Sequence, residues 1–396
     1  MDAKFKISHP LKFINTAQFF MKKISFFLLL LFFSKLGFGQ HIITGNVNDV
    51  QNKSRLFGTF IQVENSTIRT ISNDNGDFEI KLLTLPSIII VSHVGYKKVR
   101  LLIDNSKSLK IKLVQEPIEL AEVRVGNPAI SILNAVVDKA RSIETPKRYF
   151  NAFYRRISSN NGDVSRVQEI CMNVSWGVEG VSEWQPTNIR YAKVNPLPSR
   201  NVYFLSFLYS AIFHKNEVFS INSTEIGKGY DLKIKNYIDI DSPEEIAVIS
   251  FESIDKQKNG YIFIKTKKNQ LLKVVENQKI KMRHRFKMTL TFEANFRENA
   301  KGETIFDNIF ILESTGRSLD FKKANEKVWL YFQDEIDSFE KGTIYPAFLK
   351  SDAKIMLSVP YNPDYWKKNI PFPATDNIKK IIEKMEQSNK FTSNFN

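Results

Sequence analysis

The chain of 396 residues has a formal net charge of +15 and a single cysteine, Cys171. One cysteine excludes an intramolecular disulfide, so stability must come from buried apolar surface, and the length is ample for two hydrophobic cores. The basic charge is spread along the chain and is not interleaved with aromatic residues, which argues against nucleic acid as a partner. An anionic lipid or polysaccharide surface fits this charge better.

Residues 1–39 are predicted to be a signal peptide. A basic segment beginning at Met21 precedes an apolar run at 24–33, which at about ten residues is too short to span a bilayer. Small residues at Gly37 and Gly39 place cleavage before Gln40. Met21 is an alternative start, and an uncleaved anchor is the alternative to a signal. We expect export to the periplasm or outer membrane, with a charge of about +10 and no transmembrane helix after cleavage.

The segment Asp74-Asn75-Gly76-Asp77 predicts a tight turn. Asp and Asn side chains bond to their own backbone, and Gly adopts positive φ freely. Short alternating segments surround this turn at a spacing typical of a small antiparallel sandwich. The predicted strands are 42–47, 60–63, 70–72, 78–80, 87–92, 97–103 and 109–114.

The same region carries a recognisable pattern of turn residues. It consists of Gly45-x-Val47, Gly58-Thr59 with Val63, Ser72-x-Asp74-x-Gly76-x-Phe78 and Val91-Ser92-x-x-Gly95-Tyr96. Residues 40–115 therefore resemble the carboxypeptidase-like regulatory domain; an unrelated sandwich with a common hairpin is the alternative. The resemblance implies a seven-stranded prealbumin-like β-sandwich, common in envelope proteins of Gram-negative bacteria, that docks or binds and does not catalyse.

Residues 116–146 are predicted to be a linker and a helix. The segment 119–125 resembles the connection that follows this domain in TonB-dependent outer-membrane receptors, but the remaining chain of about 270 residues is too short for a plug and large barrel. Asn127 can cap a helix that has Pro128 at its first position. Its apolar face would comprise Ile130, Leu133, Val136, Val137 and Ala140.

Residues 147–370 are predicted to be a second domain dominated by antiparallel sheet. The clearest strand is 286–296, where apolar and polar residues alternate. Further strands are expected at 246–251, 261–265, 271–276, 308–312 and 328–332. This meander loosely resembles the LolA-like half-barrels of lipoprotein carriers, and an outer-membrane barrel is disfavoured because no aromatic girdle recurs. Residues 371–396 would form a C-terminal helix, capped by Asp376, and a tail.

The candidate ligand-binding residues are aromatic. The most apolar stretch after the signal, 202–213, is predicted to be a buried helix or the wall of an apolar pocket. It contains Phe204, Phe207 and Phe213. Phe286 and Phe292 lie on the apolar side of the clearest strand and would face a ligand held in a curved sheet.

The catalytic and metal-binding patterns in the sequence are weak, and we predict no metal site and no cofactor. His214 and Glu217 form an H-x-x-E, but the one later His lies in a basic stretch that would repel a cation. Asp239 and Asp241 cluster carboxylates without the glycine of an EF-hand loop. Cys171 lies in an apolar, strand-like run and is expected to be a buried apolar residue.

The sequence therefore predicts a mainly β protein with some α-helix, a small seven-stranded sandwich followed by a larger α+β domain. A non-enzymatic envelope protein fits best, with the sandwich docking to a partner and the larger sheet holding an apolar or extended ligand. Two alternatives remain open. One is an accessory component of a TonB-dependent uptake complex, bound to an outer-membrane receptor; the other is a hydrolase or metallopeptidase-related enzyme whose site is assembled from distant residues.

Overall fold

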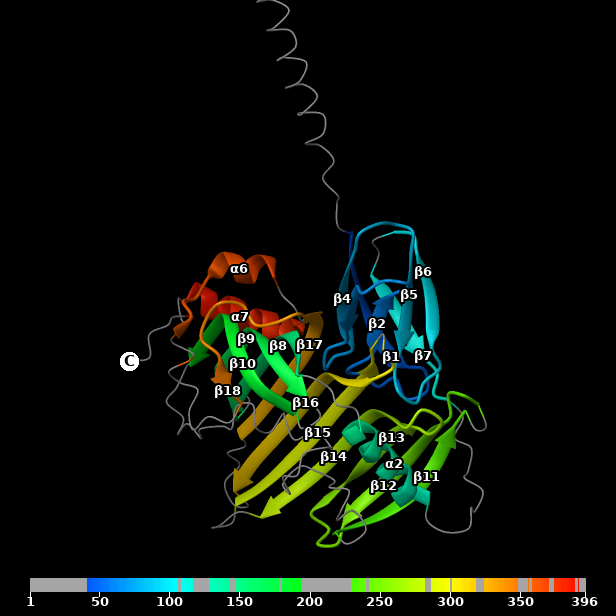
Figure 1. The fold of residues 1–396 in the computed structure, drawn as a ribbon. Helices are drawn as coiled ribbons and strands as arrows, with labels where there is room; N and C mark the ends of the chain where they lie inside the picture. The colour runs from blue at the N-terminus through cyan, green and yellow to red at the C-terminus, as the bar shows by residue number, and fades with distance from the viewer. Residues whose placement is uncertain are drawn as a thin grey trace, which may run out of the picture.

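The computed structural model has two parts, a small sandwich and a larger sheet domain with helices (Figure 1). The residues it describes are 41–105, 108–116, 128–142, 147–161, 163–177, 180–193, 229–239, 242–281, 286–299, 301–317, 324–347, 355, 358–369, 374–388 and 391. The predicted signal peptide and the receptor-like connection at 119–125 lie outside the described residues.

The first part is the predicted seven-stranded sandwich. Its strands are β1 (His41–Asp49), β2 (Phe60–Val63), β3 (Arg69–Ile71), β4 (Asp77–Leu82), β5 (Ser87–Ser92), β6 (Val99–Ile103) and β7 (Leu109–Leu113). One sheet has the order β4-β1-β7 and the other β3-β2-β5-β6. Alternate residues of both sheets, such as Ile43, Ile61, Phe78 and Val91, form the buried core between them.

The turn before β4 forms as its residues predict, and Asn73 organises it. The Asn73 side chain accepts hydrogen bonds from the backbone N–H groups of Asn75 and Asp77, at 2.9 and 3.0 Å. Gly76 has φ +74°, and a side chain there would collide with the carbonyl of Val47. The turn is thus a rigid element of the sandwich.

The second part is built on one long antiparallel sheet. Its strands are β8 (Arg148–Asn160), β9 (Asp163–Gly177), β10 (Gly180–Lys193), β11 (Tyr230–Ile238), β12 (Ile246–Ser253), β13 (Lys258–Lys265), β14 (Gln270–Lys281), β15 (Phe286–Glu298), β16 (Thr304–Arg317), β17 (Ala324–Ile336) and β18 (Tyr345–Pro346). Among the described residues they follow the order β11-β12-β13-β14-β15-β16-β17-β8-β9-β10-β18. A simple meander therefore runs from β11 to β17, and β17 pairs with β8, the first strand of this part of the chain.

The two faces of this sheet have different cores. Alternation on β8 sends Phe150 and Tyr154 into a large inner cluster, while Phe153 joins a second cluster on the outer face. The helix α2 (Pro128–Ser142) packs on the inner face through Leu133 and Val137, beside β11 and β13 (Figure 1). A helix is therefore present after the predicted linker, and Leu133, Val136 and Val137 of its expected apolar face are buried.

Two C-terminal helices cover the outer face. They are α6 (Pro363–Lys368), which buries Trp366, and α7 (Asp376–Gln387), which buries Ile378, Ile382 and Met385. The expectation that Asp376 caps α7 is wrong, since Thr375 has the extended backbone of a cap and its hydroxyl accepts the Ile378 N–H at 3.3 Å. Asp376 instead places a carboxylate in the first turn.

Candidate ligand-binding face and interdomain groove

The inner face of the large sheet carries buried polar side chains at one place. On β14, Val274, Glu276 and Gln278 alternate with outward-facing residues, so all three share the inner face. The partners of Glu276 across the ladder are Gly260 on β13 and Phe292 on β15. Glu276 is only 4% exposed and Gln278 only 7%, so both polar groups sit in an otherwise apolar core.

Neither polar group is fully satisfied. Glu276 Oε1 and Gln278 Oε1 have no hydrogen-bond partner among the described residues. Burial raises the pKa of Glu276 to about 7, with the nearby charge of Lys258 acting in the opposite direction. Near neutral pH this carboxyl therefore exchanges between a protonated form, which donates a hydrogen bond, and an ionised form, which accepts only.

A tyrosine completes the polar group on this side of the sheet. Burial raises the pKa of Tyr230 to about 12, and the charges of Glu276 and Asp255 act in the same direction. The Tyr230 ring packs edge-on against Phe251, with 5.9 Å between ring centroids. Aromatic surface and a few polar groups are the combination that binds a largely apolar molecule and orients its polar end.

The predicted ligand-binding residues are only partly visible. Phe292 lies on the inner face opposite Glu276 and is 7% exposed. Phe286 begins β15, opposite Arg317, and its side chain is outside the described residues. Also outside them are Phe204, Phe207, Phe213, His214, Glu217 and Asp241.

Nothing in the described part of the chain forms a metal centre. No group of three His, Cys, Asp or Glu side chains there is placed to hold an ion. Asp239 has φ +53°, and its carbonyl accepts the Ser242 N–H at 3.2 Å, so it belongs to the turn after β11.

Cys171 is buried on the outer face, as expected. It is 6% exposed, and burial raises the pKa of its thiol to about 12. The thiolate is the nucleophilic form, so a thiol with this pKa is a poor nucleophile near neutral pH.

Sequence reasoning missed Glu276 because it took this residue as the end of a strand. β14 continues to Lys281, so the polar residues 276 and 278 occupy inward positions. The available signal was the alternation itself, because the period that sends Val274 inward also sends Glu276 inward.

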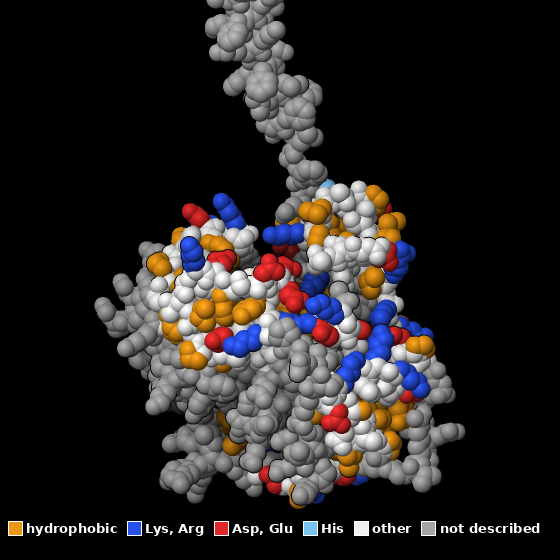
Figure 2. All heavy atoms as spheres, in the orientation of Figure 1, with side chains coloured by type: hydrophobic (Ala, Val, Ile, Leu, Met, Phe, Trp, Pro, Cys, Tyr) orange, Lys and Arg blue, Asp and Glu red, His pale blue; other side chains and the backbone are white. Residues whose placement is uncertain are grey.

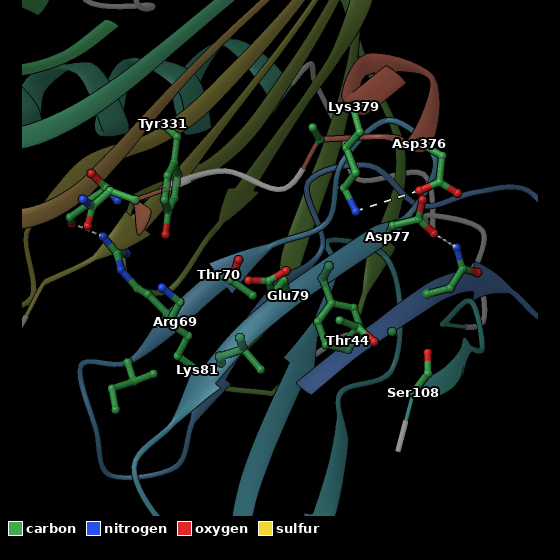
Figure 3. Close-up of a pocket in the computed structure, with 18 of the residues that line it drawn as sticks. Thr44, Arg69, Thr70, Asp77, Glu79, Lys81, Ser108, Tyr331, Asp376 and Lys379 are labelled. Carbon is green, nitrogen blue, oxygen red and sulfur yellow. Dashed lines mark hydrogen bonds and ion pairs between the residues drawn. The ribbon is translucent and has the colours of Figure 1, made fainter. Parts of the chain in front are cut away.

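A cavity lies between the sandwich and the sheet domain. It has a volume of about 880 Å³ and is lined by β1, β3 and β4 on one side and by β17, α6 and α7 on the other. Figure 3 shows Asp77 of the sandwich close to Asp376 and Lys379 of α7 across this groove, with Glu79 farther along β4 and Lys81 on the side of Arg69. We refer to it as the interdomain groove.

At one end of the interdomain groove the sandwich is fastened to the sheet by Arg69. Its guanidinium lies 3.0 Å from the Asp307 carboxylate and donates to the Phe332 carbonyl at 3.1 Å. Asp74, at the tip of the rigid turn, accepts from Lys327 at 2.8 Å. The interface thus combines a nearly buried ion pair with contacts to strand β17.

Replacing Arg69 with methionine is expected to loosen this docking and to lower the free energy of unfolding by about 1–3 kcal/mol. Asp307 keeps Arg297 as a partner at 3.1 Å, which limits the loss. We expect calorimetry to show one transition for the wild type and a broadened or split transition for Arg69→Met. Arg100→Met, which removes an exposed ion pair with Glu64 in the same sandwich, should leave the melting profile unchanged. Equal melting of wild type and Arg69→Met would contradict the assignment.

Fold and contacts together define the class of this protein: a mainly β protein in which a regulatory-type sandwich is docked on a long antiparallel sheet. Residues 43–125 match the family described as the CarboxypepD_reg-like domain, so the first domain is a carboxypeptidase-like regulatory domain. No curated protein matches the chain.

Two solved structures are each similar to about half of this chain. A LolA superfamily protein from Nitrosomonas europaea is 13% identical, with 52% of this chain and 94% of that chain covered and a TM-score of 0.22. A DUF1329 family protein from Desulfovibrio piger is 9% identical, with coverage of 54% and 96% and a TM-score of 0.23. TM-scores this low describe a partial overlap of folds, so no activity is carried over to this chain. Among the helices that the structure describes, none has the length and hydropathy needed to cross a membrane.

Proposed function

We propose that this chain is a non-enzymatic binding protein, exported to the cell envelope, whose large sheet holds an apolar or extended ligand on its inner face. The observation that carries the proposal is the pair of unpartnered oxygens on Glu276 and Gln278 within the apolar core. The apolar segment at 24–33 supports the location, because it has the length of a signal-peptide core.

The energetic case rests on what an apolar core tolerates. Leaving a buried polar atom without a partner costs about 1–3 kcal/mol, and native proteins keep few such atoms. Two of them lie two residues apart on one strand, and Phe292 is the cross-strand neighbour of Glu276. A core that served stability alone would favour leucine at these positions, so we infer that a ligand supplies the missing donors.

The chemistry of the site narrows the ligand class. Oxygen acceptors on Glu276 and Gln278 suit a hydroxyl, amide or ammonium group, while the surrounding Phe and Ile side chains suit hydrocarbon. A lipid or acyl-bearing molecule with one donor group meets both conditions. The pKa of Glu276 is raised to about 7, and the ionised carboxylate is a better acceptor than the protonated acid. We therefore expect a ligand with a neutral donor group to bind more tightly as the pH rises through about 7.

The test is native mass spectrometry of the mature chain from Gln40, purified from its own envelope, with lipid extraction and metal analysis. We expect a co-purifying lipid or acyl species that is reduced at least about tenfold by the double substitution Glu276→Leu with Gln278→Leu, a loss of about 1.4 kcal/mol. Glu252→Gln, at an exposed position on β12 of the same sheet, is the control.

Two outcomes would overturn the proposal. A wild-type chain that carries no lipid would rule out the proposed ligand. A lipid retained equally by the double variant would rule out Glu276 and Gln278 as its binding site. Stoichiometric zinc would instead favour the metallopeptidase-related alternative and direct attention to His214 and Glu217.

A further inference from the structure

The strand β4 lies at the edge of its sheet. It pairs with β1 on one side, and the described residues place no strand on the other. The direction of its free backbone groups follows from the register. Val47 donates to the carbonyl of Gly76, the residue opposite it, so this pair is hydrogen-bonded and the pairs along β1 and β4 alternate from there.

Alternation makes Phe78 and Ile80 the residues that bond to β1, and it turns the backbone groups of Asp77, Glu79 and Lys81 outward. Asp77 agrees with this assignment, because its outward N–H and C=O both bond to Asn73. Glu79 and Lys81 therefore present N–H and C=O groups at the open edge. Such groups form the template for an added strand.

This edge forms a wall of the interdomain groove. Phe78 and Ile80 line the groove but each residue is only 2% exposed, whereas Glu79 and Lys81, which also line it, are exposed. The docked sheet domain stays away from the edge here and encloses about 880 Å³ instead of covering it. Six residues of β4 offer an edge about 20 Å long.

The groove has an acidic balance on a basic protein. Its charged lining residues, among those described, are Asp77, Glu79, Asp334, Asp376, Arg69, Lys81 and Lys379. Arg69 is engaged by Asp307, and Lys379 lies 3.9 Å from Asp376. This leaves three carboxylates, Asp77, Glu79 and Asp334, and one amine, Lys81. The lining is thus acidic on a chain whose net charge is +15. Figure 2 shows red side chains where the two parts meet, with blue ones beside them.

We propose that the interdomain groove binds an extended, basic peptide segment of an envelope partner, which adds to β4 as a further strand. Backbone hydrogen bonds to Glu79 and Lys81 supply the pairing, and the carboxylates select lysine or arginine side chains. This site is separate from the inner face of the large sheet, and its occupation does not depend on the ligand proposed there.

The test on the ligand side uses a fluorescein-labelled peptide of five Thr-Lys repeats, with binding to the full mature chain followed by fluorescence anisotropy. Two further peptides are N-methylated at every Thr or at every Lys, which removes backbone donors and keeps the charge. We expect at least one methylated peptide to bind about tenfold or more weakly than the parent. A Thr-Glu repeat should not bind in the groove, because its negative charge is repelled by the carboxylates there.

The test on the protein side uses position 79. Glu79→Pro removes an outward N–H that takes no part in the ladder with β1, so the edge strand can accommodate it. We expect a loss of at least about tenfold for Glu79→Pro and a smaller loss for Glu79→Gln, which keeps the N–H and removes the charge. Glu252→Gln on the distant β12 is the control and should bind like the wild type.

The proposal fails in three cases: if the parent peptide does not bind, if both methylated peptides bind as well as the parent, or if a folded Glu79→Pro binds like the wild type. The last two results would indicate attraction by charge without strand addition. The methylated peptides distinguish the two modes of binding even where Glu79→Pro does not fold, since they leave the protein untouched.

Discussion

Replacing Glu169 with glutamine is expected to lower the free energy of unfolding by about 3–5 kcal/mol, because it removes the buried carboxylate that faces the guanidinium groups of both Arg155 and Arg190. Glu169 is fully buried on β9 and accepts from Arg155 of β8 and Arg190 of β10. Arg190 also lies 3.3 Å from Glu386 of α7 and stacks 4.6 Å from the centre of the Trp366 ring. The network therefore joins three strands to both C-terminal helices.

The pKa of Glu169 gives this prediction a pH signature. Burial alone opposes ionisation, but the two arginines outweigh it and lower the pKa below its usual range. The stabilisation is therefore present above the ordinary glutamate pKa and is lost as the pH falls through the lowered native value. The difference between wild type and Glu169→Gln should shrink accordingly in strongly acidic buffer.

Urea denaturation of both proteins at several pH values measures these effects. The matched control is Glu183→Gln on β10, which breaks a pair with Lys147 that is 39% and 56% exposed. A change of less than about 1 kcal/mol is expected there. If Glu169→Gln cost no more than Glu183→Gln, the buried network would not stabilise the fold.

Replacing Glu276 with glutamine is expected to stabilise the unliganded protein above neutral pH, by up to about 3 kcal/mol at pH 8. The glutamate pKa rises from 4.5 to about 7 on folding because the charged form is buried. The unfolded chain loses this proton at a lower pH than the native chain, so wild-type stability falls as the pH rises from about 4.5 to about 7. Glutamine imitates the protonated acid at every pH and should remove this dependence.

The measurement is the denaturation midpoint of wild type, Glu276→Gln and the exposed control Glu252→Gln between about pH 4 and about pH 8. The curve of the Glu276→Gln variant should coincide with wild type at the acidic end and lie above it at the basic end, while the control follows wild type throughout. Parallel curves for wild type and Glu276→Gln would contradict the assignment. A stabilising change at this position would also fit a group kept for binding, since functional sites often carry polar groups at a cost in stability.

The local signals in the sequence were reliable where the structure is local. The turn at 74–77 is held by hydrogen bonds to Asn73 within the same segment, and β2 with β3 and β5 with β6 pair as neighbours in the chain, so side-chain alternation and turn residues were sufficient to predict them. The same holds for α2, whose apolar positions recur with the helical period. The strand at 286–296 was also found, because it keeps one apolar face along its whole length.

The long strands β8, β9 and β10 were predicted only as a β-rich region. Their buried charges at Arg155, Glu169 and Arg190 break the alternation that marks a strand, since each looks like a solvated residue until its partners are known. The pairing of β8 with β17 joins segments from opposite ends of the domain, which no local pattern specifies.

By itself, the sequence determined the class of the first domain, the mainly β character of the second and the helix between them, because these follow from short-range periodicity and turn chemistry. Only the tertiary structure decided the candidate sites. It placed Arg69 against Asp307, 238 positions away, and opened the interdomain groove beside β4. It also buried Glu276 with a carboxylate oxygen that no described residue satisfies. Burial, strand register and edge position depend on how segments distant in the sequence pack together. Local sequence patterns do not specify that packing.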